Sequence, residues 1–169
     1  MKRHLILMRH AKSSWKEPGQ EDHARPLNKR GRRDAPRVAE RLVELGWTPQ
    51  RVLLSDAART RETWSLMRAA FQPAPAVEER PDLYLAGLER IRAGLAKVPA
   101  GEGTVLVLGH NPGWEDAVSA LVGQPISLTT ANAALLEGEG PSWAEALDGA
   151  WRLVEVVRPK ELPGGDAED

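Results

Sequence analysis

A short apolar run near the start of the chain is the feature that most restricts the fold. Residues 3–9 contain four consecutive large apolar side chains, Leu5 to Met8, with no polar residue between them. A strand with one face in water alternates apolar and polar side chains, whereas a strand covered on both faces does not. The run therefore predicts a buried strand of a parallel sheet.

Strands and helices alternate along the rest of the chain. The clearest further strand is 104–108, and the full expected set is strands at 51–54, 76–79, 104–108, 133–137 and 151–157 with helices at 29–45, 57–70, 87–97 and 112–121. This order predicts the α/β class, as a three-layer α/β/α sandwich with a mostly parallel central sheet. Because no good helix separates the last two strands, one antiparallel edge strand is expected.

Residues that typically begin or end helices indicate some of these boundaries. Asn28 is a suitable N-cap for the first helix, and Gly46 and Gly123 follow the expected ends of two helices. Pro36 conflicts with this pattern because it removes a backbone donor, which leaves open where the regular part of the first helix begins.

The composition is that of an ordinary globular protein. The chain has 169 residues, 41% hydrophobic and 28% charged, and no cysteine. This length fits one domain, expected at 1–160, followed by a polar tail at 161–169. The absence of cysteine excludes a disulfide framework and a thiolate metal site.

The charge distribution indicates what kind of molecule the protein can bind. A net charge of −1 argues against a nucleic-acid binder, but residues 1–61 hold 15 basic and 7 acidic side chains, and residues 62–169 hold 8 and 17. The basic half suits an anionic substrate, although solvated helix surfaces explain many of these charges equally well. The first apolar run is too short for a signal peptide or a membrane span, so we expect a cytoplasmic protein without a membrane partner.

Polar side chains follow three of the predicted strands. Arg9 and His10 follow the first, Ser55 and Arg59 follow the second, and His110 follows the strand at 104–108. Ligands of open α/β sheets bind outside the carboxyl ends of the strands. Two guanidinium groups and two imidazoles at this edge would suit a tetrahedral anion such as phosphate.

Taken singly, each of these residues has a plainer explanation. Arg9 and His10 could mark the point where a buried strand meets water, and Arg59 could pair with Glu62 or Glu40. Elsewhere, His4 within a strand and His23 in the polar loop at 11–28 are expected to be structural or solvated. That loop is long enough to be functional, and Trp15 is its one large apolar residue and its expected anchor.

Three segments resemble the signatures of a known family. The chain resembles the histidine phosphatase superfamily, which has the phosphoglycerate-mutase-like fold. The resemblance lies in Arg9-His10, in the spacing of Ser55, Arg59 and Thr63, and in Gly109-His110-Asn111. The strings LMRHAKSSW, DHARPLNKRGRRDA and VLGHNPG are similar to its small SixA-like branch of phosphohistidine phosphatases. The resemblance extends over residues 3–158.

The resemblance implies roles for particular residues. His10 is the expected nucleophile, which forms a phosphohistidine intermediate that water hydrolyses, and Arg9, Arg59 and His110 complete the phosphate pocket. Further phosphate or substrate contacts are expected from Lys12, Ser13, Asn111, Arg25 and Asp22. Asp22 could orient Arg25 or an arginine of the pocket, or it could form a surface ion pair of little value. No metal or other cofactor is implied.

Two departures from the family pattern affect the choice of substrate. Ala11 stands where the superfamily usually has glycine, a change that the small branch tolerates. The glutamate that larger relatives use as general acid has no clear counterpart, and Glu79 and Asp82 are the nearest carboxylates. An alkoxide leaves poorly unless it is protonated, so phosphohistidine on a protein is the leading substrate.

Two other functions stay open at this stage. One is hydrolysis of a small phosphomonoester such as a sugar phosphate, with Glu79 or Asp82 as the acid. The other is a phosphate-binding module that has lost catalysis. The sequence also lacks the long insertions that cover the site in larger relatives, so an open pocket is expected.

Overall fold

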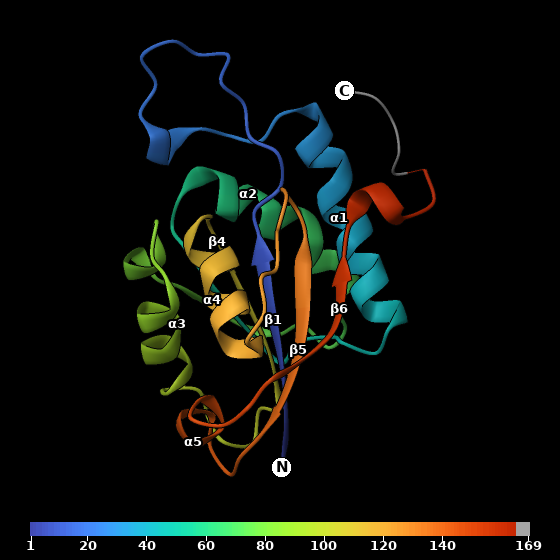
Figure 1. Cartoon of the computed structure of the whole chain (residues 1–169). Coiled ribbons are helices and arrows are strands. Elements are labelled where there is room, and N and C mark those ends of the chain that lie inside the picture. Colours follow the sequence, from blue (N-terminus) through green and yellow to red (C-terminus); the bar gives the residue numbers. More distant parts are fainter. Residues whose placement is uncertain (165–169) are drawn as a thin grey trace.

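A six-stranded sheet forms the centre of the protein, whose computed structural model describes residues 1–164 (Figure 1). Its strand order is β3-β2-β4-β1-β5-β6. The strands are β1 (Lys2–Arg9), β2 (Arg51–Leu54), β3 (Ala76–Glu79), β4 (Thr104–Gly109), β5 (Ala133–Glu139) and β6 (Arg152–Val157). The helices are α1 (Lys29–Glu44), α2 (Ala58–Met67), α3 (Leu88–Leu95), α4 (Gly113–Val122) and α5 (Trp143–Leu147), with short 3₁₀ turns at Asp22–Ala24, Arg68–Ala70, Pro81–Leu83 and Pro159–Glu161.

The central strands bury side chains on both faces of the sheet. Leu5 and Leu7 of β1 belong to one apolar cluster, whereas Ile6 and Met8 belong to another on the opposite face. All four side chains have no exposed surface. The continuous apolar run is thus explained by a strand that has a core on each side.

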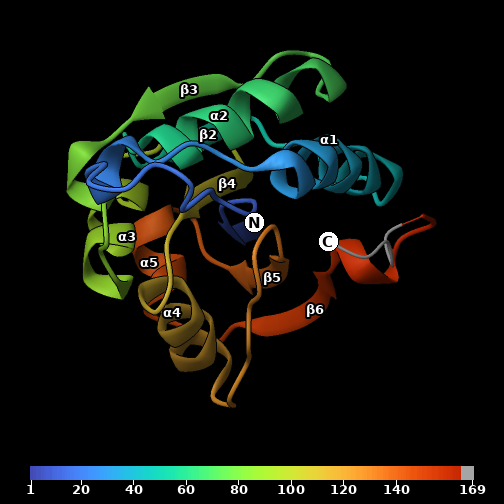
Figure 2. The same ribbon diagram turned by 90° about the horizontal axis from the view of Figure 1, so that it is seen from above.

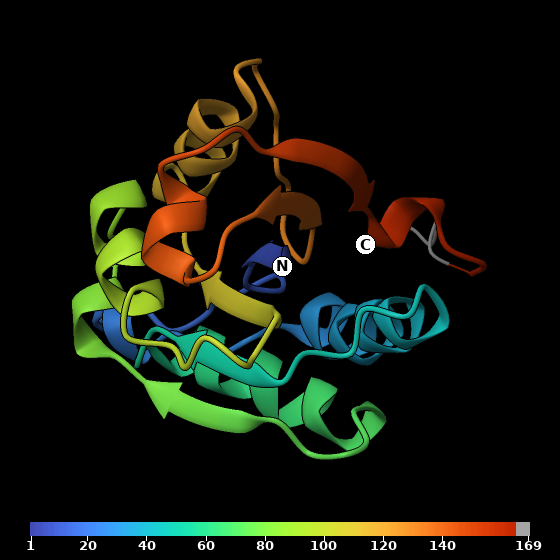
Figure 3. The same ribbon diagram turned by 90° about the horizontal axis from the view of Figure 1, so that it is seen from below.

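Helices cover both faces of the sheet. Helices α1 and α2 lie on one face, and α3, α4 and α5 lie on the other, as the view from above shows (Figure 2). Figure 3 shows α5 beside α3, and Figure 1 places α5 at the end of the sheet away from the carboxyl end of β1. The expected three-layer α/β/α sandwich is confirmed.

The sheet is mostly parallel, as expected, and the antiparallel strand lies one position inside the edge. Strands β1, β2, β3 and β4 run parallel to one another, and β5 runs antiparallel to both β1 and β6. The edge strand β6 consequently has the same direction as β1. The connection between β5 and β6 contains α5, a helix that the sequence analysis did not predict.

Helix α1 begins at Lys29 and continues through Pro36. The Asn28 side chain accepts a hydrogen bond from the backbone N–H of Gly31 at 2.9 Å, which confirms the predicted N-cap. Gly31 packs against the loop after β1 so closely that an added Cβ would lie 2.2 Å from the Lys12 carbonyl oxygen. This contact fixes α1 against the chain that follows His10.

The loop at 11–28 closes upon itself at its base. An isolated bridge joins Ser13 to Leu27, and the Asn28 N–H donates to the Lys12 carbonyl at 2.9 Å. Trp15 does not anchor this loop, because its side chain is 75% exposed. The expectation for Trp15 was therefore wrong, and backbone hydrogen bonds hold the base of the loop instead.

The expected tail at 161–169 lies partly outside the described residues, which end at 164. Within the described part, Leu162 packs against the apolar cluster under α1, and the Pro163 carbonyl accepts a hydrogen bond from Arg37 at 2.7 Å. Residues 161–164 are therefore attached to the body of the protein. Among the helices described, none has the length and apolar character needed to cross a bilayer.

We predict that Gly31→Ala destabilises the protein. Alanine favours a helix by about 1 kcal/mol over glycine, but overpacking against the Lys12 backbone costs roughly 1–3 kcal/mol. Urea unfolding should show a net loss of stability. Gly101→Ala is the control, because a Cβ at Gly101 meets nothing within 4 Å. Equal stability of Gly31→Ala and the wild type would contradict the close packing.

Candidate active site

The carboxyl ends of β1, β2 and β4 meet at a pocket of about 350 Å³. Its lining contains every residue expected for the phosphate pocket and for the further substrate contacts, namely Arg9, His10, Lys12, Ser13, Asp22, Arg25, Arg59, His110 and Asn111, together with Trp15, Leu85 and Thr130. Among the described lining residues, four side chains are cationic and one is a carboxylate. The pocket is therefore suited to an anion.

His10 has a defined tautomer. Its Nδ1 lies 2.6 Å from the Ala11 carbonyl oxygen, which can only accept a hydrogen bond, so Nδ1 carries the proton. The lone pair is then on Nε2, which accepts a hydrogen bond from Arg59 Nε at 3.3 Å. Nε2 is thus the nucleophilic nitrogen of the ring.

The His10 ring is neutral at physiological pH. Burial is the main cause that lowers the pKa of His10 from 6.5 to about 3. The Ala11 carbonyl opposes this effect, and the positive charges of Arg59 and Arg9 add to it. A neutral imidazole keeps the lone pair that a nucleophile needs.

The loop peptide beside His10 is held by the first turns of α2. The Ala11 N–H donates to Thr63 Oγ1 at 3.1 Å, and the Thr63 hydroxyl donates to the Arg59 carbonyl at 2.7 Å. Ala11 itself is fully buried. Thr63 of the sequence motif therefore positions the chain next to His10.

Asp22 holds two arginines of the pocket. Arg59 donates to the Asp22 carboxylate at 2.9 Å and to its backbone carbonyl at 2.7 Å, and Arg25 Nε donates to the same carboxylate at 3.1 Å. Arg25 also donates to Ser13 Oγ at 2.7 Å. Both guanidinium groups are almost fully buried, whereas the Asp22 side chain that orients them is 41% exposed. Arg59 forms its ion pair with Asp22 and not with Glu62 or Glu40, the two partners considered from the sequence.

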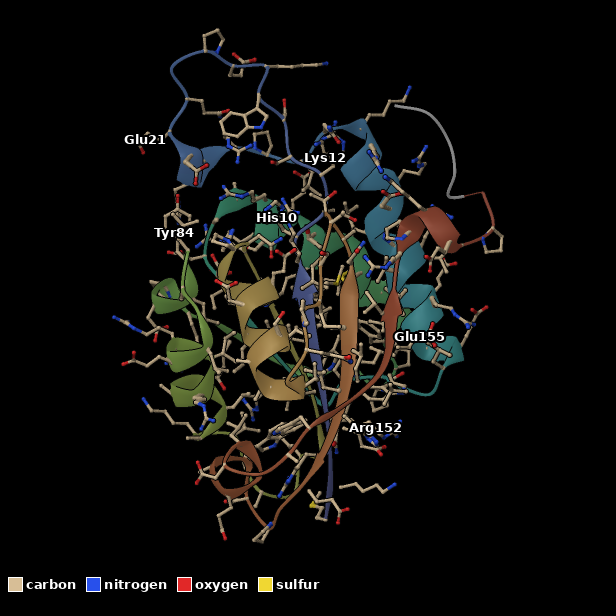
Figure 4. All side chains as sticks on the ribbon, in the orientation of Figure 1. His10, Lys12, Glu21, Tyr84, Arg152 and Glu155 are labelled. Carbon is tan, nitrogen blue, oxygen red and sulfur yellow. The ribbon has the colours of Figure 1, made fainter. Side chains whose placement is uncertain are left out.

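Tyr84 supports the pocket from behind its lining residues, and the sequence analysis missed it. Its hydroxyl donates a hydrogen bond to the Asp22 carboxylate, and its ring lies edge-on to His110 and to His23, at 5.4 Å and 4.8 Å between ring centroids. Figure 4 shows Tyr84 and His10 at the same end of the sheet. The only signal in the sequence was that the chain has a single tyrosine, placed in the segment searched for a general acid.

The Asp22 carboxyl is ionised. Partial burial opposes its charge, but hydrogen bonds from Tyr84, Arg59 and Arg25 outweigh burial and hold the pKa of Asp22 well below its usual range. Burial and the Asp22 charge also raise the pKa of Tyr84. The carboxylate in the pocket therefore acts as an acceptor for its neighbours and holds no proton to donate.

His110 has one paired and one unpaired ring nitrogen. Nε2 lies 2.7 Å from Ser55 Oγ, and that oxygen accepts a hydrogen bond from the Ala57 N–H at 3.2 Å. Nδ1 is buried and has no hydrogen-bond partner among the described residues. Burial is the main cause that lowers the pKa of His110 to about 3, and the positive charge of Arg59 adds to it.

The remaining predicted residues have more modest roles. Arg9 donates to the Leu128 carbonyl at 3.1 Å, and its buried Nε has no partner among the residues described. The Asn111 amide also donates to Leu128, at 2.8 Å, so that its side chain fixes the loop before β5. Lys12 is exposed at the rim. Thr130 was not predicted and carries no motif that would have indicated it.

Neither carboxylate proposed as general acid lies at the pocket. Glu79 of β3 pairs with Arg61 at 2.7 Å, and Asp82 pairs with Arg80 at 3.1 Å. Neither residue lines the pocket. A hydrogen bond from Arg80 is the largest of the causes that lower the pKa of Asp82. Both candidates are therefore engaged in ion pairs outside the site.

The two other histidines are structural, as expected. His4 Nε2 lies 3.0 Å from the Glu137 carboxylate, and its ring packs against Trp47. His23 Nε2 lies 2.9 Å from the Asp56 carboxylate and so joins the 11–28 loop to the residues before α2. No group of three potential metal ligands occurs in the part of the chain that the structure describes.

Fold and pocket together define a class, an α/β protein with an anion site built on two histidines and several arginines. A family model for the histidine phosphatase superfamily (branch 1) matches residues 5–84. The chloroplastic protein At3g52155 of Arabidopsis thaliana is 44% identical over 171 residues, which cover 93% of this chain and 78% of that protein.

Two solved structures extend this similarity over the whole fold. SixA of Nakamurella multipartitia is 31% identical with a TM-score of 0.82, covering 94% of this chain and 97% of that one. SixA of Agrobacterium tumefaciens is 27% identical with a TM-score of 0.79, covering 93% and 98%. Both are described as candidate phosphohistidine phosphatases. The chain therefore belongs to the histidine phosphatase superfamily as a SixA-like member, and it is a phosphatase.

We predict that the His10 and His110 rings do not titrate in the free protein between about pH 8 and pH 5. Both have pKa values lowered to about 3, so both stay neutral over this range. NMR titration of the ring signals, assigned with His10→Gln and His110→Gln variants, measures this directly. A titration midpoint near pH 6.5 for either ring would show that burial does not lower its pKa and would contradict the prediction.

We predict that Asp22→Asn destabilises the protein near neutral pH by roughly 1 kcal/mol, a small value because the carboxylate is 41% exposed and water screens it. The folded-state pKa of Asp22 is depressed, so its contribution is complete above the unfolded value of about 3.9 and is lost as the pH falls through the folded value. Urea unfolding at about pH 7 and pH 3 should therefore show a difference that shrinks in acid. Glu21→Gln, a neighbouring exposed acid, is the control.

Proposed function

We propose that this phosphatase removes phosphate from phosphohistidine on a protein through a covalent intermediate on His10. The observation that carries the proposal is the His10 tautomer, with its proton on Nδ1 and its Nε2 lone pair beside Arg59 in a cationic pocket. A neutral imidazole held among phosphate-binding groups is suited to attack on phosphorus.

In the proposed first step, His10 Nε2 attacks the phosphorus and the P–N bond to the substrate imidazole breaks. The electron pair of that bond goes to the leaving nitrogen. A substrate ring protonated on its second nitrogen then leaves as neutral imidazole. The Ala11 carbonyl, which accepts from Nδ1, stabilises the positive charge that develops on the His10 ring.

In the second step, water attacks the phosphorus on His10. The P–N bond to Nε2 breaks, and inorganic phosphate and neutral His10 are formed. Arg59 and Arg9 would stabilise the charge on the phosphoryl oxygens. Nδ1 of His110 would supply a further hydrogen bond in the tautomer in which the Ser55 hydroxyl donates to Nε2 and Nδ1 carries the ring proton. Lys12 at the rim and the buried Arg25 add further positive charge.

The lack of a placed general acid supports phosphohistidine over an alkyl phosphate. Among the described residues that line the pocket, Asp22 is the one carboxylate. Hydrogen bonds from Tyr84, Arg59 and Arg25 keep it ionised. An alkoxide leaving group requires a proton at the breaking bond, whereas a protonated imidazole does not. The resemblance to SixA structures supports the same substrate class.

We predict that His10→Ala lowers turnover of protein phosphohistidine by at least a factor of about 1,000, because the variant lacks the nucleophile. Wild-type protein mixed with labelled substrate should retain an acid-labile phosphoryl group on His10. The matched control is His4→Ala, which removes an imidazole bound to Glu137 outside the pocket. Normal turnover by His10→Ala would contradict the proposal.

A substrate panel separates the remaining alternatives. We expect a phosphohistidine protein and phosphoramidate to be hydrolysed, and sugar phosphates to be poor substrates. Efficient hydrolysis of a sugar phosphate would favour a small phosphomonoester instead. Binding of phosphate without turnover or phosphorylation of His10 would indicate a binding module. Loss of activity with a chelator would contradict the metal-independent mechanism.

The cellular location proposed from the sequence is the cytoplasm. The Arabidopsis relative is named as chloroplastic, so the two proteins would act in different compartments if this proposal holds. A fluorescent fusion of the full chain, observed in the cell of origin, tests it.

A further inference from the structure

We propose that Trp15 and Leu85 form a carrier-binding rim, meaning two apolar side chains that contact the protein on which the phosphohistidine is borne. This inference rests on the proposed function and deepens it by naming residues that select a protein substrate over a small one. Trp15 belongs to the 11–28 loop, and Leu85 follows the turn at Pro81–Leu83.

The two side chains stand out from the other exposed apolar residues by their position. Six large hydrophobic side chains are exposed in the described part of the chain, and isolated examples of this kind are ordinary. Trp15 and Leu85 are 75% and 58% exposed, and both line the pocket that contains His10. None of the other four lines that pocket.

Trp15 is exposed and yet held in place. The Arg25 guanidinium carbon lies 3.4 Å from the centre of the Trp15 ring, so the two planar groups are in contact. Arg25 is itself buried and bonded to Asp22 and Ser13. The indole is therefore presented to solvent on a fixed base. A rigid exposed aromatic ring is the kind of side chain that dominates binding energy at protein interfaces.

Leu85 is presented by an unusual backbone conformation. Its φ angle is 53°, in the left-handed region that residues other than glycine seldom adopt. The preceding residue, Tyr84, donates its hydroxyl to the Asp22 carboxylate. Asp22 thus supports both sides of the rim, through Arg25 to Trp15 and through Tyr84 to Leu85.

The dimensions of the pocket separate the phosphoryl site from the rim. The groups suited to the phosphoryl transfer, His10, Arg59 and His110, are at most 6% exposed and lie within a pocket of about 350 Å³. This volume is near the lower end for ligand pockets and accommodates a phosphoryl group with its imidazole ring. The backbone and surface of the carrier must then lie outside, at the level of the exposed rim.

A protein that carries the phosphohistidine is the ligand that would contact both rim side chains. A phosphoryl group and one ring satisfy the buried cations, but they leave apolar surface of Trp15 and Leu85 in water. A carrier whose phosphohistidine is bordered by apolar side chains would bury that surface, which favours association. The rim is continuous with the pocket, so the same encounter would serve both contacts.

The test compares two substrates that share the reacting bond. One is a phosphotransfer domain phosphorylated on its exposed histidine, and the other is the free amino acid phosphohistidine. Trp15→Ala and Leu85→Asn are measured against the wild type, with asparagine chosen because it tolerates left-handed backbone. Val154→Ala is the matched control, since Val154 is 40% exposed on β6 and lies outside the pocket.

We expect each rim variant to lower the ratio of kcat/KM for the domain to kcat/KM for free phosphohistidine by about tenfold, mainly through a higher KM for the domain. Val154→Ala should leave the ratio unchanged. An unchanged ratio in both rim variants would overturn the inference, including the case in which Trp15→Ala slows both substrates equally through Arg25. Failure of the wild type on both substrates would instead overturn the proposed function.

Discussion

The parallel pairing of β4 with both β1 and β2 is the constraint on which the site depends. Backbone hydrogen bonds continue one residue beyond the ends of β1 and β2, from the His10 N–H to the Gly109 carbonyl at 3.0 Å and from the Ser55 N–H to the Leu108 carbonyl at 3.2 Å. Because the three strands point in one direction, their carboxyl ends bring Arg9, His10 and His110 together. Cores on both faces fix this register, since a slip by one residue would move every side chain to the opposite face.

Gathering cations in a buried place has a cost that the 11–28 loop offsets. Arg59 and Arg25 are removed from water, and the Asp22 carboxylate and backbone carbonyls satisfy their donors. This carboxylate still leaves the pocket with excess positive charge. The loop is therefore part of the site. It supplies the negative charge of Asp22, which allows the Arg59 and Arg25 guanidinium groups to lie close together.

Much of the fold and of the site followed from sequence patterns, and the exceptions have physical reasons. The apolar runs predicted the central strands, and residues at strand ends predicted a pocket whose lining includes His10, Arg59 and His110. Helix α5 was missed because five residues are too few for a clear periodic pattern. Tyr84 was missed because its partner Asp22 is 62 residues away, and no local pattern encodes such a contact. Trp15 was misjudged because an aromatic ring in a loop can pack on an arginine as well as on a core.

The hydrogen bond from His10 Nδ1 to the Ala11 carbonyl has an evolutionary consequence. In many sites a side-chain carboxylate fixes the histidine tautomer, and one substitution removes it. Here the acceptor is a peptide oxygen, which every residue at position 11 would supply. The tautomer is thus encoded in the path of the chain, which the N–H of Ala11 secures against Thr63. The chemistry of His10 therefore depends on the residues that shape this path, and the side chain at position 11, which is buried in the core, matters through its packing alone.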